Sequence, residues 1–216
     1  MPPDRAAPSL WEELQEVYDT YLAHSFGKTL PDRPLVEHWK VKSERAARIF
    51  LGMPWLPVAL FRIRDRLVRW NVPLLPYLCE LLSGGIWGVS IGRYVEVGPG
   101  LIIPHGHLIV DGAVKIGRDC VINPWVTIGL SNSRRWGFRY QGPTIGDRVF
   151  IGTGAKVLGP ITVGDGALIG ANAVVIDDVP AGATVVGVPA RVVRESQPDW
   201  RAIAEAFGSA ARGGEG

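Results

Sequence analysis

The chain has 216 residues, of which 47% are hydrophobic and 20% are charged, and its formal net charge is +2. This length allows one large domain or a domain with an appendage, and the composition excludes a disordered chain. The weak net charge argues against a nucleic-acid partner. With only two cysteines and no uninterrupted apolar run of about 18 residues, the sequence predicts a cytoplasmic protein that has neither a signal peptide nor a membrane span.

The first 85 residues follow a helical pattern. Ser9 can cap a helix, and Glu12 three positions later completes a capping box. Residues 41–69 place apolar side chains at helical spacing among arginines, which favours a helix packed on its neighbour with its arginines in water; a membrane-surface helix is the alternative. Residues 74–82 form an apolar run that is short and contains Pro76, so it predicts a buried helix rather than an anchor.

From residue 89 onward the pattern changes, because aliphatic residues recur every six positions. Neither a helix of 3.6 residues per turn nor a strand alternation of two residues produces this period, whereas a triangular solenoid with one strand and one corner per six residues does. About five coils fit between residues 89 and 193, with one slipped position and one interruption. The residues predicted to point inward are Ile91, Val97, Ile103, Ile109, Ile116, Ile122, Ile128, Ile145, Ile151, Val157, Val163, Ile169 and Val175.

Residues 89–193 resemble the hexapeptide-repeat acyltransferases, most closely the serine acetyltransferase branch and the related capsule and colanic acid acetyltransferases. The resemblance is carried by the final coils, residues 143–193, including the Gly-Val-Pro-Ala-Arg turn that ends at Arg191. It implies a mainly β protein whose residues 86–195 form a left-handed parallel β-helix. An N-terminal α-helical region would occupy residues 1–85, and a short helix with a flexible tail residues 196–216. It also implies a homotrimer with active sites between subunits, or a dimer of trimers.

Two of the four histidines, His105 and His107, lie in the coils. The repeat places His107 at an inward position before Ile109 and His105 on the outer face, where it can meet a substrate. A neutral imidazole can take the proton of a hydroxyl group as that group attacks a thioester carbonyl. The resemblance implies that His105 is this general base. His107 is interpreted either as a buried ring or as part of the substrate site.

The resemblance also implies acetyl-CoA as the acyl donor, bound along a groove between coils or subunits. Small residues would let the pantetheine arm approach, and basic residues would meet the phosphates. A glycine in a hexapeptide is also an ordinary corner residue, so that interpretation stays open. No metal is predicted. The predicted CoA-binding residues are Gly129, Gly152, Thr153, Lys156, Gly170, Ala171 and Arg191.

The surroundings of the predicted base depart from the serine acetyltransferase pattern. That family carries a carboxylate directly before the histidine and an aspartate earlier in the chain, where this sequence has Pro104 and Ser90. Glu96 and Asp111 are the remaining carboxylates that could orient His105, and the sequence does not choose between them.

Residues 130–142 interrupt the repeat and predict a loop that binds the acceptor. Guanidinium groups bind phosphate or carboxylate and aromatic faces bind sugar rings, so the loop fits an anionic or nucleotide-linked carbohydrate. A loop that seals a subunit interface is the alternative. Trp125, which replaces a small residue, could stack on a sugar or pack on a neighbour. The predicted substrate-binding residues are His107, Trp125, Arg134, Arg135, Trp136, Arg139 and Tyr140.

Together these features predict an acetyl-CoA-dependent O-acetyltransferase that acts by direct transfer to a carbohydrate or similar small-molecule hydroxyl, in polysaccharide biosynthesis. Serine O-acetylation for cysteine biosynthesis is the first alternative, and N-acetylation of an amino sugar also stays open. A zinc enzyme on the same solenoid would need three converging histidines. A non-catalytic scaffold is the most distant alternative.

Overall fold

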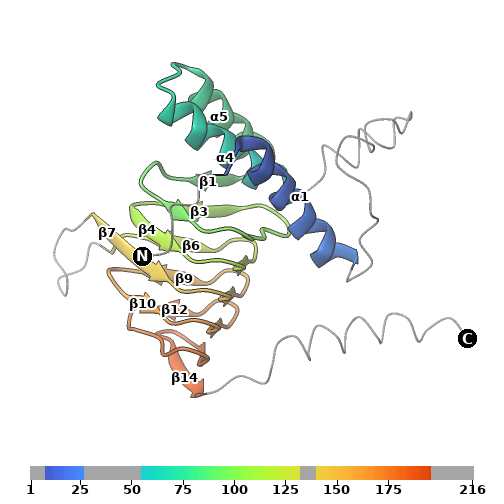
Figure 1. Cartoon of the computed structure of the whole chain (residues 1–216). Helices are drawn as coiled ribbons and strands as arrows, with labels where there is room; N and C mark the ends of the chain where they lie inside the picture. Colours follow the sequence, from blue (N-terminus) through green and yellow to red (C-terminus); the bar gives the residue numbers. More distant parts are fainter. Residues whose placement is uncertain (1–7, 27–54, 132–139, 196–216) are drawn as a thin grey trace, which may run out of the picture.

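The computed structural model describes residues 8–26, 55–131 and 140–195, and within these ranges three helices lie at one end of a three-sided prism of strands (Figure 1). The helices are α1 (Leu10–Phe26), α4 (Leu56–Arg69) and α5 (Leu75–Trp87). The capping box of α1 is confirmed: Ser9 N–H donates to Glu12 Oε2 at 2.6 Å, and Glu12 N–H donates to Ser9 Oγ at 3.2 Å. Part of the predicted helical segment 41–69, and the short helix predicted in the tail, lie outside the described residues.

The strands form three sheets, which we call A, B and C. Sheet A contains β1 (Val89–Ile91), β3 (Leu108–Val110), β6 (Thr127–Gly129), β9 (Lys156–Leu158) and β12 (Val174–Val175). Sheet B contains β2 (Glu96–Val97), β4 (Ala113–Ile116), β7 (Gln141–Ile145) and β10 (Thr162–Val163). Sheet C contains β5 (Val121–Ile122), β8 (Phe150–Ile151), β11 (Leu168–Ile169), β13 (Thr184–Val186) and β14 (Arg191–Arg194).

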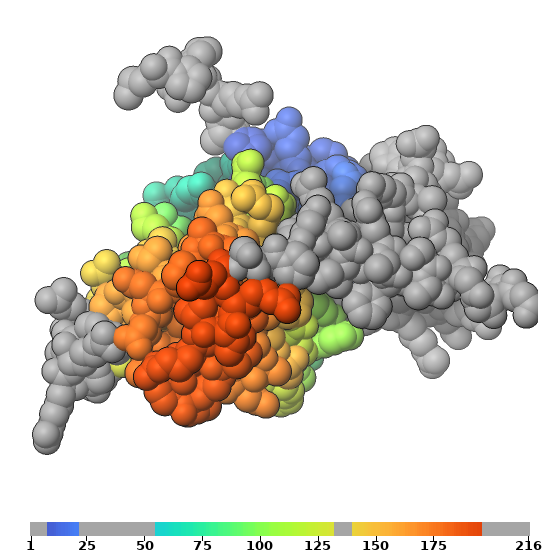
Figure 2. All heavy atoms as spheres, turned by 90° about the horizontal axis from the view of Figure 1, so that it is seen from below, coloured from blue at the N-terminus to red at the C-terminus, as the bar shows by residue number. Residues whose placement is uncertain are grey.

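The chain visits sheets A, B and C in turn, so each strand of sheet A begins a new coil of a parallel β-helix. All strand pairs are parallel except the last, β13 with β14, which is antiparallel. The mainly β solenoid predicted from the six-residue period is therefore confirmed. Viewed from below, the last coils lie at the end of the prism farthest from the helices (Figure 2).

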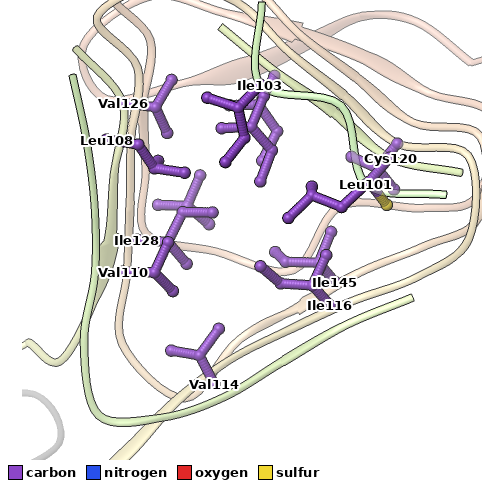
Figure 3. Packing of buried hydrophobic residues seen from close by; sticks show 14 of the residues in the cluster. Leu101, Ile103, Leu108, Val110, Val114, Ile116, Cys120, Val126, Ile128 and Ile145 are labelled. Atoms are coloured by element: carbon purple, nitrogen blue, oxygen red, sulfur yellow. The ribbon is translucent and has the colours of Figure 1, made fainter. Parts of the chain in front are cut away.

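The interior of the prism is filled by the aliphatic residues of the repeat. Ile103, Val110, Ile116 and Ile128 point into the triangle from its different sides (Figure 3). One predicted inward residue is wrong: Ile109 is 52% exposed, whereas Leu108 and Val110 on either side of it are buried. The one-residue slip of the repeat therefore falls before Val110 rather than after Ile109. As a consequence, the inward position predicted for His107 is also wrong, and His107 is exposed.

Helix α5 differs from its prediction as a buried helix. Its packed face carries Pro76, Cys79 and Ser83, and its outer face carries most of the large apolar side chains. The sequence does not show which face of the helix packs on the prism, because both faces are apolar. The face with the smaller residues packs inward, since small side chains allow a closer approach to the neighbouring elements. The exposed apolar side chains on and beside the helix are Leu74, Leu75, Tyr77, Leu78, Leu81, Leu82 and Ile86.

A buried arginine fastens the helices to the first coil. The Arg64 side chain from α4 is buried; it pairs with Asp65 at 2.8 Å and lies 3.7 Å from Glu80 of α5. It also donates hydrogen bonds to the carbonyl oxygens of Ile91 and Gly92 at the end of β1. A buried charge needs such partners, since desolvation without them is costly. Within the described ranges, no helix combines the length and the apolar character that crossing a membrane requires.

Candidate active site

The corner between sheets C and A, which we call the C–A edge, gathers most of the predicted site residues. The register of sheet A makes Gly88, His107, Trp125, Gly154 and Asn172 equivalent positions in successive coils. All five have a left-handed backbone, with φ of 66°, 53°, 66°, 75° and 56° respectively. Glycine and asparagine adopt this conformation at low cost, histidine less often, and tryptophan only as an outlier.

His105 lies exposed at the first corner of the C–A edge, as its outward phase predicted. The corner rests on the end of α5, because His107 N–H donates to the Trp87 carbonyl oxygen at 2.8 Å. Gly106 has a φ of 74°, and a Cβ there would collide with the same carbonyl oxygen. The C-terminus of α5 thus packs against the segment that carries the predicted base. No residue pattern predicts this contact, because it joins two elements of different periodicity.

His107 and Trp125 form an aromatic stack beside His105. Their ring centroids are 4.3 Å apart with an angle of 29° between the planes. Trp125 N–H donates to the His107 carbonyl oxygen at 2.6 Å, and Lys156 Nζ donates to the Trp125 carbonyl oxygen at 2.7 Å. Trp125 is nevertheless 61% exposed. The structure therefore places both predicted acceptor residues, His107 and Trp125, on the outer surface of the C–A edge, the edge that also carries His105.

The predicted CoA-binding residues are divided between two edges. Gly152, Thr153, Gly170 and Ala171 lie at the C–A edge in the coils that follow Trp125, in line with His105. The two glycines also have a packing role. A Cβ on Gly152 would lie 2.7 Å from the Ala171 amide nitrogen, and one on Gly170 would lie 2.7 Å from a methyl group of Val186.

The remaining predicted CoA ligands lie elsewhere or are engaged. Gly129 ends β6, at the corner between sheets A and B, where a Cβ would lie 3.1 Å from the Asp111 carbonyl oxygen. Arg191 starts β14, is exposed, and lies 3.7 Å from Asp177. Lys156 lies at the start of β9 on the C–A edge, but its ammonium group is held by the Trp125 carbonyl oxygen.

Neither predicted orienting carboxylate meets His105 within the described chain. Glu96 lies on sheet B and pairs with Lys115 at 3.1 Å. Asp111 follows β3 at the far end of the strand and accepts a hydrogen bond from Gly112 N–H at 2.8 Å. A strand rises about 3.3 Å per residue, so the backbone separates Asp111 from the C–A edge by roughly 13 Å. Within the described part of one chain, Glu96 and Asp111 therefore lie away from the C–A edge that carries His105, and their predicted role stays a prediction.

The predicted acceptor loop is described only at its ends. Arg134, Arg135, Trp136 and Arg139 lie outside the described residues. Tyr140 is exposed where the loop returns to sheet B, and its carbonyl oxygen accepts a hydrogen bond from Ala113 N–H at 3.0 Å. The described chain therefore leaves β6 and enters β7 at the corner between sheets A and B, whereas His105 lies at the C–A edge, at the other end of the sheet A strands.

Comparisons with known proteins agree with this architecture. Residues 142–177 match the family model described as bacterial transferase hexapeptide (six repeats). Over 179 residues the chain is 44% identical to a serine acetyltransferase of Helicobacter pylori strain J99, covering 82% of this chain and 98% of that relative. It is 40% identical over 136 residues to a serine acetyltransferase of Synechococcus elongatus, covering 62% of this chain and 54% of that relative.

A solved structure gives the same result. The crystal structure of serine acetyltransferase from Vibrio cholerae O1 biovar El Tor superposes with a TM-score of 0.71 at 25% sequence identity, covering 89% of this chain and 69% of that one. The aligned region spans about half the length of the relatives from Synechococcus elongatus and Mycobacterium tuberculosis. Fold and sequence thus point to one group of proteins.

Proposed function

The chain belongs to the serine acetyltransferase family of hexapeptide-repeat acyltransferases, and we propose that it transfers the acetyl group of acetyl-CoA to a hydroxyl group. The observation that carries this proposal is the exposed His105 at the head of the C–A edge, in line with a row of small corner residues. Acetyl-CoA is a cosubstrate here, so its pantetheine arm would run past Gly152, Thr153, Gly170 and Ala171 toward His105.

In the proposed reaction His105 accepts the proton of the acceptor hydroxyl as the oxygen attacks the thioester carbonyl. The tetrahedral intermediate then collapses, its C–S bond breaks, and the CoA thiolate takes a proton from the imidazolium ion. No covalent enzyme intermediate is involved. Backbone N–H groups at a corner of the coil are suitable donors to the oxyanion, because they are preorganised by the solenoid.

Two acceptors have support from different observations. Free serine is supported by the relatives, which are serine acetyltransferases, and the comparisons favour it over the carbohydrate acceptor predicted from the sequence. They give no support to the predicted role in polysaccharide biosynthesis. A carbohydrate hydroxyl is the second candidate, because Trp125 exposes its indole at the edge that carries His105 and a sugar ring can stack on such a face.

The proposal is tested by thiol release from acetyl-CoA with L-serine and with a panel of sugars and sugar nucleotides. His105→Ala should lower kcat about 10²- to 10⁴-fold, the usual contribution of a general base. Circular dichroism and gel filtration should match the wild type, because His105 is exposed and packs little. Turnover of His105→Ala within threefold of wild type would contradict the assignment of the base.

The remaining expectations form part of the same proposal. We propose left-handed winding of the coils, the domain limits 1–85, 86–195 and 196–216, a cytoplasmic location, and a homotrimer with active sites between subunits. An interface between subunits could bring a carboxylate to His105 from a neighbouring chain. An experimental structure of the assembly with CoA tests the handedness and the origin of that carboxylate together.

A further inference from the structure

We propose that Lys156 is a positioning residue for the acceptor side of the site, and that it acts through Trp125 and His107. It would then not be the CoA ligand that the sequence predicted. This inference rests on the proposed acetyl transfer and adds a role for a chain of contacts along the C–A edge. The chain runs from Lys156 Nζ to the Trp125 carbonyl oxygen, through the indole to the His107 ring, and so to the segment that carries His105.

The backbone of Trp125 is the unusual member of this chain. At the equivalent corner, other coils use Gly88, Gly154 and Asn172, which tolerate a positive φ, and His107, which adopts it less often than these but is less bulky than tryptophan. A bulky side chain persists in that conformation only where its surroundings enforce it, and such outliers cluster at functional sites. Here the enforcing contacts are visible: Trp125 N–H donates to the His107 carbonyl oxygen at 2.6 Å, and its own carbonyl oxygen accepts from Lys156.

The other side of the stack is closed by the end of α5. A Cβ on Gly88 would lie 3.0 Å from Cδ2 of the His107 ring. The absence of a side chain at Gly88 therefore provides the space that the ring occupies. His107 thus lies between the helix end and the indole. The outer side of the pair is exposed, and His107 follows His105 by two residues. In the proposed arrangement, an acceptor whose hydroxyl group reaches His105 lies along this aromatic surface.

The ammonium group of Lys156 is engaged in the hydrogen bond to Trp125. Its bond to the Trp125 carbonyl oxygen is 2.7 Å long, as expected for a charged donor. Thr127 and Val174 occupy the position of Lys156 in the neighbouring coils. Neither has a charged group that could donate a hydrogen bond to a carbonyl oxygen of the previous coil. The lysine and the tryptophan are therefore paired departures from the repeat.

The test separates the acceptor side from the CoA side. Lys156→Met should raise the KM of the acceptor at least fivefold and leave the KM of acetyl-CoA within twofold of wild type. Lys156→Arg should restore most of the acceptor KM, because the guanidinium can donate to the same carbonyl oxygen. Trp125→Ala should show the same split. Lys115→Met is the matched control, because Lys115 is an exposed lysine on sheet B and should change neither constant.

A second readout needs no acceptor. The indole N–H resonance of Trp125, assigned by its loss in Trp125→Phe, should shift in Lys156→Met and return toward wild type in Lys156→Arg. An unchanged resonance, or a rise in the KM of acetyl-CoA with a normal acceptor KM, would overturn the inference in favour of a phosphate contact. Absence of transfer by the wild type to L-serine and to every sugar would instead overturn the proposed function.

Discussion

At the scale of one residue, Cys120 shows how burial inside the coils changes the pKa of a titratable side chain. Its thiol is fully buried and lies 3.2 Å from the Gly146 carbonyl oxygen, to which it can donate. Burial raises the pKa of the thiol to about 11. Burial likewise raises the pKa of Cys79 on the packed face of α5. Neither thiol is therefore a nucleophile at neutral pH, which agrees with direct transfer rather than an acyl-enzyme.

Thiol labelling checks this conclusion. With a pKa of about 11, only about a thousandth of Cys120 is thiolate at pH 8, so Cys120 in the native protein should react with a disulfide reagent at least 100-fold more slowly than in the unfolded chain. Because the folded pKa is raised, the stabilising effect of the protonated thiol is present below the unfolded pKa and is lost as the pH rises toward 11. Rapid native labelling of both cysteines would contradict this picture.

His107 and Ile109 show why residue phase was harder to predict than the repeat itself. A buried aliphatic at every sixth position identifies coils, and from Ile116 onward it identifies the inward residues correctly. Around His105 the chain contains one extra residue, and the run Leu108, Ile109, Val110 offers three aliphatic candidates for two inward positions. Sequence alone cannot place the slip within such a run. The predicted orientation of His107, which directly precedes the run, was wrong for this reason.

At the scale of elements, Arg64 decides how α4, α5 and the first coil are joined. Its side chain is 2% exposed and connects carboxylates and backbone carbonyl oxygens from three elements. The arginine spacing suggested charges in water on one helix face. The structure places some of those arginines against the prism instead, because the helix lies directly over the carbonyl oxygens that end the β1 strand.

Replacing this side chain should loosen the helices from the prism. Arg64→Met leaves carboxylates and carbonyl oxygens without their buried cation, and removal of one partner from a buried pair typically costs about 3–5 kcal/mol. We expect a loss of this size in urea unfolding, with the helices melting before the coils. Arg69→Met on the exposed side of α4 is the control and should change stability by less than about 0.5 kcal/mol. Equal stability of the two variants would refute the role assigned to Arg64.

At the scale of the whole molecule, the outer face of α5 is the feature that a single chain leaves unexplained. Leu78 and Leu81 are 48% and 70% exposed and lie among other large apolar side chains of the same helix. Monomeric proteins rarely expose large contiguous patches of this kind. The patch lies at the helical end of the prism, away from the last coils (Figure 1). We therefore expect contacts between copies of the chain to cover it.

Light scattering after gel filtration tests this expectation. The double variant Leu78→Glu and Leu81→Glu should lower the molar mass of the assembly, because charges would be buried at the contact. Tyr94→Glu, an equally exposed position on the first coil, should leave the mass unchanged. An assembly of wild-type mass in the double variant would show that α5 is not an interface between copies.

The three-sided architecture was predictable because every coil repeats the same packing, so an error at one position does not alter the period. The active site was less predictable, because it depends on contacts between coils and at the end of a helix. Lys156 was assigned to CoA from its charge, and its bond to Trp125 could not be read from residue spacing. Asp111 was close to His105 in sequence, but a whole strand separates them in space.

The antiparallel strand β14 also affects whether neighbouring molecules can stack end to end. A stack of coils ends in strands whose open backbone groups could accept a further coil, and then another, from neighbouring molecules. By folding back onto β13, β14 occupies the open side of sheet C in the opposite direction. A further parallel coil cannot continue that sheet, so the chain carries its own stop against end-to-end growth into a fibre.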